Sequence, residues 1–271
     1  MGHGISWLSF IPGFFELQQQ LAHTWKGLLF GQPLVLQHTL AALFVVLILL
    51  VVGIKINLDI KKAGENAIIP EPGVSLRNIV EALLEALYSQ AQQIIGPEAR
   101  RCFPVLATFA MFILFSNLLG LIPGFTPPTD NWNTTFGCSI FIFLYYNYQG
   151  LRKNGWQHIA HLANPAGAWW GWFMAPLMLP IEIVSHLVRP FSLGVRLATN
   201  MLVDHMVVGT FLGLFPILVP LPFLLLGLLV SIIQTLVFTL LSMVYIALAV
   251  EDAHADEHEH ATDSAHAHAA A

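Results

Sequence analysis

A run of polar residues between Glu182 and Asn200 lies inside one of the most apolar parts of the chain. Wound as an α-helix at roughly 100° per residue, the run brings six polar side chains onto one stripe. Measured from Arg196, the others are Arg189 at about 20°, Glu182 and Asn200 at about 40°, Ser185 at about −20° and Ser192 at about −40°. A permanently charged Arg at membrane depth is costly and normally faces protein or a water-filled cavity. Arg196 is therefore a candidate functional residue.

The chemistry that this stripe suits is moving an ion past a fixed charge. An Arg guanidinium keeps its proton, with a pKa above about 12, and offers five donors in a flat fork. A carboxylate brought within about 4 Å of it gains about 4 kcal/mol at an effective dielectric of about 20. This lowers the carboxyl pKa by about three. Such a shift deprotonates a membrane-buried carboxylic acid whose pKa desolvation had raised.

The residues leave some roles open. Glu182 precedes Arg196 by fourteen residues, about 21 Å along a straight helix, which argues against a direct pair between them. Glu182 either lines a water-filled channel or serves as a structural partner for Arg189. His205, about 180° from Arg196 around the helix, either belongs to a proton path or packs.

The composition predicts an all-α, polytopic integral membrane protein. The 271 residues are 56% hydrophobic and 10% charged, whereas soluble domains are near 25% charged. A soluble fold of this composition would leave large apolar patches in water. No basic patch suggests nucleic acid, and the sequence contains no P-loop, HExxH motif or paired-cysteine zinc site. We therefore expect no cofactor, no metal and no catalytic activity. Cys102 and Cys138 are two buried thiols or a disulfide pair.

The apolar pattern predicts about five membrane helices in a single membrane domain over residues 36–250. The expected spans are about 36–54, 102–122, 133–150, 168–214 and 223–250, with a polar loop over 56–74 and an amphipathic surface helix over about 75–95. Residues 168–214 are too many for one perpendicular crossing. They form either two spans that meet near Arg189 and Pro190 or one steeply tilted helix.

Basic residues set the expected orientation. They follow the first span, precede the second and end the third, as Lys55, Lys61, Lys62, Arg100, Arg101, Arg152 and Lys153. The positive-inside rule then places the N-terminus outside and the C-terminus in the cytoplasm. Residues 1–35 would be an external or interfacial leader. Residues 251–271 would be an acidic, His-rich tail that is either disordered and solvated or metal-binding.

A second, thinner stripe falls on the last span. Gln234 is its only strongly polar side chain apart from hydroxyls. Relative to Gln234, Gly227 and Tyr245 both fall at about 20° and Phe238 at about 40°.

At these residues the sequence resembles subunit a of the F-type ATP synthase. The segment 189–201, Arg-Pro-Phe-Ser-Leu-Gly-Val-Arg-Leu-Ala-Thr-Asn-Met, resembles the signature of that family. Gln234 with Val244 and Tyr245 supports the resemblance, as does the segment 116–123, Ser-Asn-Leu-Leu-Gly-Leu-Ile-Pro. The pattern of spans fits from about residue 36 to residue 250.

The resemblance implies a non-catalytic membrane stator subunit of a bacterial inner membrane. Its partners would be a rotating c-ring, b-type peripheral stalk subunits, membrane lipid and protons. It would move the ion through two offset half-channels at the c-ring interface and couple the proton gradient to ATP synthesis. Residues 168–214 would form the long tilted helix.

The resemblance also assigns site residues. Arg196 would displace the proton from each rotor carboxylate and block leakage, with Asn200 and Gln234 flanking it. Glu182, Ser185 and Ser192 would line one half-channel, and His205 would serve a channel away from the rotor. Arg189 occupies the basic position that opens the signature.

Some positions depart from the family pattern. Gly227 stands where a titratable residue is common, so a proton relay there must use water or Asp204 and His205. Gly120 stands where many bacterial members have an acid, and Thr199 where a Gly precedes the Asn. The sequence does not decide whether the transported ion is a proton or sodium. An ion-coupled carrier that uses Arg196 as a gating charge, and a polytopic membrane enzyme, are the alternative hypotheses.

Overall fold

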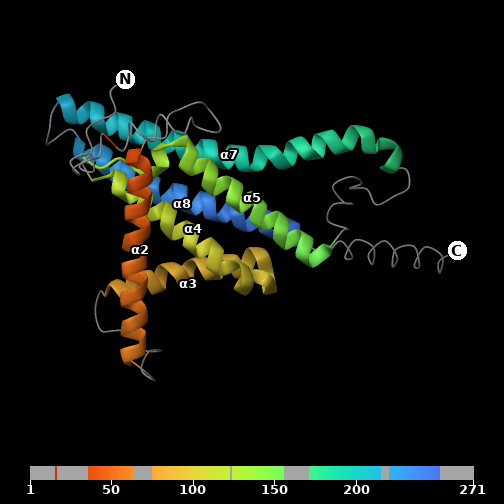
Figure 1. Cartoon of the computed structure of the whole chain (residues 1–271), viewed down its shortest axis with the longest axis horizontal. Helices are drawn as coiled ribbons and strands as arrows, with labels where there is room; N and C mark the ends of the chain where they lie inside the picture. The colour runs from red at the N-terminus through yellow and green to blue at the C-terminus, as the bar shows by residue number, and fades with distance from the viewer. Residues whose placement is uncertain are drawn as a thin grey trace.

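The computed structural model describes residues 36–63, 75–122, 124–155, 171–214 and 220–250, together with Glu16. Every regular element in these ranges is a helix, which confirms the all-α prediction (Figure 1). The elements are α2 (Leu36–Ala63), α3 (Leu76–Ile95), η3 (Gly96–Glu98), α4 (Ala99–Gly120), η4 (Pro128–Asp130), α5 (Trp132–Asn154), α7 (Gly171–Leu214) and α8 (Pro220–Val250). Apart from Glu16, the predicted leader and the predicted tail lie outside the described residues.

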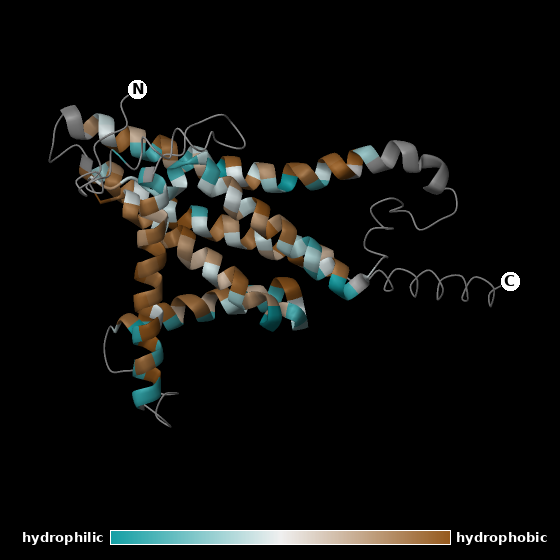
Figure 2. Cartoon of the chain, viewed as in Figure 1, coloured by the Kyte–Doolittle hydropathy of each residue, from teal (hydrophilic) through white to brown (hydrophobic). Residues whose placement is uncertain are grey.

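Three helical stretches of the described chain are long and apolar enough to cross a membrane. They are Gln37–Lys62, the stretch Leu76–Gly120 that contains α3 and α4, and Leu221–Val250. Helix α2 is mostly apolar along its length, with polar residues at its lower end (Figure 2). It continues to Ala63, whereas the sequence suggested a loop from residue 56; residues 56–63 contain no Gly or Pro to stop the helix.

Helices α5 and α7, both expected to be spans, are not among those three stretches. Polar side chains interrupt α5, and several of them bond within the helix. Asn147 Nδ2 donates to the Phe143 carbonyl at 2.7 Å, and Gln149 Nε2 donates to the Tyr145 hydroxyl at 2.8 Å. Helix α5 packs against both α7 and α8 on one side, while Phe141, Leu144 and Tyr148 on its other side are exposed.

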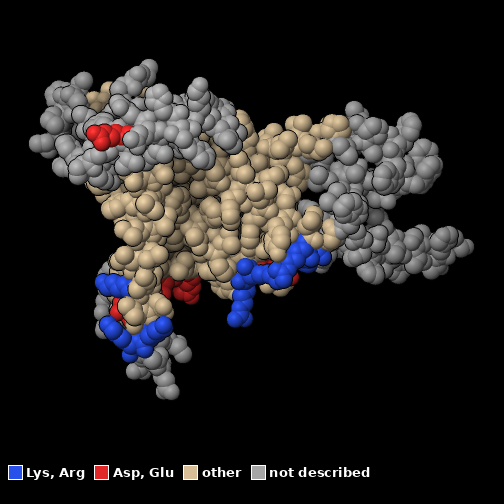
Figure 3. Space-filling view, in the orientation of Figure 1, with Lys and Arg blue, Asp and Glu red and all other residues tan. Residues whose placement is uncertain are grey.

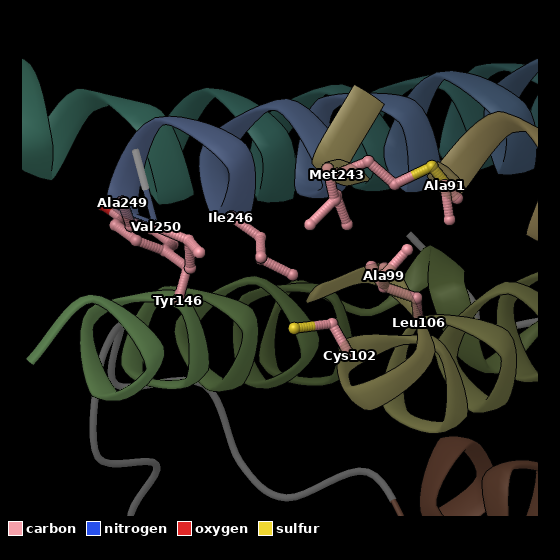
Figure 4. Packing of buried hydrophobic residues seen from close by; sticks show 10 residues of the cluster. Ala91, Ala99, Cys102, Leu106, Tyr146, Met243, Ile246, Ala249 and Val250 are labelled. Carbon is pink, nitrogen blue, oxygen red and sulfur yellow. The ribbon is translucent and has the colours of Figure 1, made fainter. Parts of the chain in front are cut away.

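Two apolar clusters join α4, α5, α7 and α8. One cluster lies where α3, α4, α5 and α8 meet and contains Ala91, Cys102, Leu106, Tyr146, Met243 and Ile246 (Figure 4). The other consists of Ile113, Cys138, Ile142, Leu193, Leu197 and Phe238. Both cysteines are free and buried, so they are two packed thiols. This core fixes one side of α7 and α8.

Helix α3 begins and ends where the sequence indicates. Ser75 is its N-cap, and its Oγ accepts from the Arg77 N–H. Gly96 ends it with φ of +75°, a conformation that suits glycine, and α4 then runs back across the molecule (Figure 1). Arg77 is buried and pairs with Glu81 at 2.8 Å, whereas Ile79 is 57% exposed.

Helix α7 is one continuous helix that passes through Arg189 and Pro190. It lies across the view of Figure 1, while α2 runs down it. The structure therefore has the single long helix rather than two helices that meet at Pro190.

Candidate functional site

Arg196 lies on the exposed side of α7. Ser192 and Asn200, one turn away on either side, are also exposed, whereas Leu193 and Leu197 are buried. Within the described ranges the Arg196 guanidinium makes no hydrogen bond and no ion pair. The exposed surface of α7 and the neighbouring α8 is otherwise largely apolar and includes Phe191, Val203, Met206, Leu225, Leu229, Ile232, Ile233 and Leu236. A fixed positive charge therefore stands on an apolar surface.

A hydrogen bond joins the two predicted stripes. Asn200 Nδ2 on α7 donates to Gln234 Oε1 on α8 at 2.7 Å. Gln234 is 3% exposed, and its Nε2 has no partner among the described residues. Asn200 lies one turn of α7 beyond Arg196, so the bond ties α7 to α8 near that residue.

A close helix contact positions this part of α7. A β-carbon at Gly194 would lie 2.8 Å from Ser139 Oγ and 3.3 Å from Phe136 Cδ1 on α5. Only glycine lets the two helices approach this closely without displacement. Because Gly194 is two residues before Arg196, this contact sets the height and rotation of the guanidinium.

Aromatic side chains hold Arg189. Its guanidinium lies 5.5 Å from the centre of the Tyr245 ring on α8. Tyr245 in turn packs beside Tyr146 of α5, whose hydroxyl is 3.3 Å from His186 Nδ1. Arg189 is thus a fixed, half-buried cation that connects α7 to α8, and His186 is part of the same packed cluster.

Carboxylates gather near the other part of α7. His205 Nδ1 is 3.3 Å from Asp130 Oδ2, and the Asp130 side chain is only 12% exposed. The neighbouring Asp204 points at α8, where a β-carbon on Gly227 would lie 2.7 Å from Asp204 Oδ2 and 2.9 Å from Leu121 Cδ2. The carboxylate of Asp204 therefore occupies the space that a side chain at position 227 would need.

The loop that carries Asp130 is anchored. Thr129 Oγ1 donates to Asn117 Oδ1 at 2.8 Å, and Gln37 Nε2 of α2 donates to Thr126 Oγ1 at 2.8 Å. A β-carbon at Gly120 would lie 2.9 Å from the Pro127 ring. Gly120 therefore has no room for an acidic side chain, and the acid beside His205 comes from η4 instead.

The structure describes the side chains of Arg196, Asn200, Gln234, Ser192, Arg189 and His205, and it brings them into three groups along α7. The side chain of Glu182 lies outside what is described, so its role stays a prediction. Asp130 was missed as a site residue. The available signal was that Asp130 is the only charged residue in the segment 123–134. No group of three metal-binding side chains occurs within the described ranges.

The comparisons with known proteins agree on one family. The model of the ATP synthase A chain family matches residues 38–247. ATP synthase subunit a of Sorangium cellulosum is 39% identical over 255 residues, which are 91% of this chain and 94% of that one. The subunit a proteins of Bdellovibrio bacteriovorus and Geobacter sulfurreducens are 45% and 44% identical, over 70% and 66% of this chain and 82% and 76% of theirs.

Proposed function

We propose, since the chain belongs to the ATP synthase A chain family, that it is the stator half of a proton path whose other half is a rotating c-ring. At the coarser level, the chain is a membrane subunit of ATP synthase that takes part in proton transport and ATP synthesis. Its role is translocation rather than covalent catalysis. The assignments below go beyond that level.

The observation that carries the proposal is Arg196, exposed and unpaired within the described chain on an apolar surface. A charge so placed is costly in lipid, which implies that a partner with a carboxylate covers it. An arriving protonated carboxyl of the c-ring loses its proton beside the guanidinium because the ionised form is stabilised there. Since Arg does not release its own proton, it also blocks direct leakage between two half-channels.

Asn200 and Gln234 position the guanidinium in this proposal. Their hydrogen bond occupies the Asn200 donor and the Gln234 acceptor, and neither group carries a charge that would neutralise Arg196. The negative charge that pairs with Arg196 is then the carboxylate of the rotor.

One half-channel uses Asp130, His205 and Asp204. The pair Asp130–His205 joins the segment between α4 and α5 to α7. Asp204 continues toward α8 at Gly227, so it supplies the titratable group that the α8 position lacks. The other half-channel would use Glu182, Ser185 and Ser192, on the opposite side of Arg196 along α7.

The basic residues give the orientation. Lys and Arg side chains gather along one edge of the molecule, which includes the lower end of α2 (Figure 3). They belong to the last turns of α2 and α5 and the first turn of α4. By the positive-inside rule this edge is cytoplasmic, with the C-terminus on that side in a bacterial inner membrane. Peripheral stalk subunits of the b type would complete the stator.

The test is ATP-driven proton pumping in membrane vesicles with Arg196→Ala and Arg196→Lys, after assembly has been verified. Both variants should lose coupled pumping, and Arg196→Ala should also let protons leak passively. Lys keeps a positive charge, but it lacks the planar set of donors of a guanidinium and, unlike Arg, it can lose its proton when buried.

Arg100→Ala is the matched control, because Arg100 is an exposed Arg on α4, outside the proposed site. It should pump normally. An assembled Arg196→Ala complex that pumps at the normal rate would overturn the proposal and favour the ion-coupled carrier.

A further inference from the structure

Two adjoining cavities lie at the basic edge of the bundle, away from the proton path. The larger has a volume of about 500 Å³ and the smaller about 220 Å³. Glu98, Lys153 and Val250 line both, so the two are neighbouring parts of one hollow. The hollow lies between the end of α3, the start of α4 and the ends of α5 and α8.

The larger cavity is walled mainly by aliphatic side chains. Ile94 and Ile95 come from the end of α3, and Val244 and Leu248 come from α8. Leu248 is 52% exposed and Val244 38% exposed, on the apolar side of α8. The cavity is therefore continuous with a surface suited to hydrocarbon chains.

The smaller cavity is polar and cationic. Arg101, Arg152 and Lys153 line it, with Glu98 as the only carboxylate among its lining residues, for a formal charge of +2 from three cations and one anion. Arg101 lies near the start of α4 and Arg152 near the end of α5. The two residues are far apart in the sequence, and the fold brings them to the same cavity. Arg guanidinium groups match phosphate oxygens in bidentate geometry.

We propose that this hollow binds an anionic phospholipid of the cytoplasmic leaflet. The phosphate group lies among Arg101, Arg152 and Lys153, and an acyl chain lies along the aliphatic wall formed by α3 and α8. Basic pockets between membrane helices on the cytoplasmic side suit such head groups. A free anion would leave the aliphatic cavity unused, and so would the acidic segment that follows Val250. The amphiphilic lining therefore favours a lipid over both.

The experiment uses the whole purified ATP synthase reconstituted into dioleoylphosphatidylcholine vesicles. Phosphatidylglycerol with a photoactivatable diazirine in its acyl chain is added, and cross-linked peptides of subunit a are identified by mass spectrometry. We expect labelling around Val244 and Leu248. Phosphatidylcholine that carries the same diazirine should label this segment at least about tenfold less, because its head group has no net negative charge.

Two variants test the site itself. Replacing Arg101, Arg152 and Lys153 by Gln should reduce the labelling about tenfold or more. The charge-matched control replaces Lys55, Lys61 and Lys62 on α2 by Gln. It removes three cations from the same edge of the molecule and should leave the labelling unchanged. Leu248→Trp fills the aliphatic cavity without changing charge, and it should also reduce labelling even where the triple variant fails to assemble.

Other results would overturn the proposal. Equal labelling by both lipids, or labelling unaffected by either site variant, means that no specific lipid site exists. Suppression by millimolar inorganic phosphate identifies a free-anion site. Labelling that appears only after residues 251–271 are removed identifies the acidic tail of the chain as the occupant. None of these outcomes bears on Arg196, so this proposal fails independently of the proton path.

Discussion

The two ends of the α7–α8 pair differ in the charge they bury. Beyond Arg196 on one side, α7 carries Asp204 and His205, which lie against Gly227 and Asp130. On the other side it carries Arg189, which is stacked on Tyr245. One end holds two carboxyl groups and an imidazole, and the other holds a guanidinium that stays charged.

Under the proposed function, this difference separates residues that transfer protons from residues that position α7. A carboxylate and an imidazole can pass a proton along, so the acidic end is suited to a half-channel. A guanidinium that lies over an aromatic ring does not transfer protons, so the Arg189 end is suited to holding α7 against α8. Substitutions at the two ends should therefore fail in different ways, and four predictions test this.

The largest effect should come from the acidic end. Asp204→Asn keeps the shape of the side chain but removes the titratable group next to Gly227. ATP-driven proton pumping should fall roughly a hundredfold, at the low end of what a positioned proton-transfer group contributes. Assembly should be normal. Asp59→Asn, which removes a carboxylate from α2, is the control and should pump normally. If Asp204→Asn pumps normally as well, Asp204 is a packing residue.

A substitution in the middle of α7 tests whether packing fixes both ends. Gly194→Ala places a β-carbon 2.8 Å from Ser139 Oγ and should destabilise the α5–α7 contact by about 1–3 kcal/mol. The measurement is the temperature at which the purified membrane sector releases subunit a.

Gly209→Ala is its matched control, since a β-carbon there has no atom within 4 Å. That change should stabilise α7 by up to about 1 kcal/mol through helix propensity. Ser139→Gly should partly restore Gly194→Ala. Equal effects of the two alanine substitutions would contradict the close contact.

The Arg189 end should show a loss of stability with little loss of intrinsic proton transfer. Tyr245→Leu removes the ring under the guanidinium and should cost about 0.5–2 kcal/mol, while Tyr245→Phe keeps the ring and should cost less. A double-mutant cycle with Arg189→Gln isolates the pair. If Tyr245→Leu abolishes pumping in a stable complex, the separation between the two ends is wrong.

The smallest effect should come from the bond beside Arg196. A double-mutant cycle with Asn200→Ala and Gln234→Ala should give a coupling energy of about 0.5–1.5 kcal/mol in stability. Coupling near zero would mean that the 2.7 Å hydrogen bond contributes nothing to holding α7 against α8.

The sequence predicted much of the fold because membrane helices have local signals. Apolar length indicates α2, α4 and α8, and Ser75 and Gly96 mark the ends of α3. The end predicted for α2 was too early, because residues 56–63 contain no Gly or Pro to stop the helix. On α3, helical periodicity states which residues share a face, but tertiary contacts decide which residues are covered: they bury Arg77, while Glu81 and Ile79 stay accessible.

The sequence alone determined the membrane class and the family resemblance and predicted a functional role for Arg196, since each rests on composition or on a contiguous motif. Only the tertiary structure decided that Asp130 meets His205, that Asp204 fills the space at Gly227, and that Arg101 and Arg152 share one cavity. These residues are far apart in the chain, and the packing of α4, α5, α7 and α8 brings them together. Such contacts leave no local signal in a single sequence, because each helix could pack equally well against other surfaces until the whole bundle is in place.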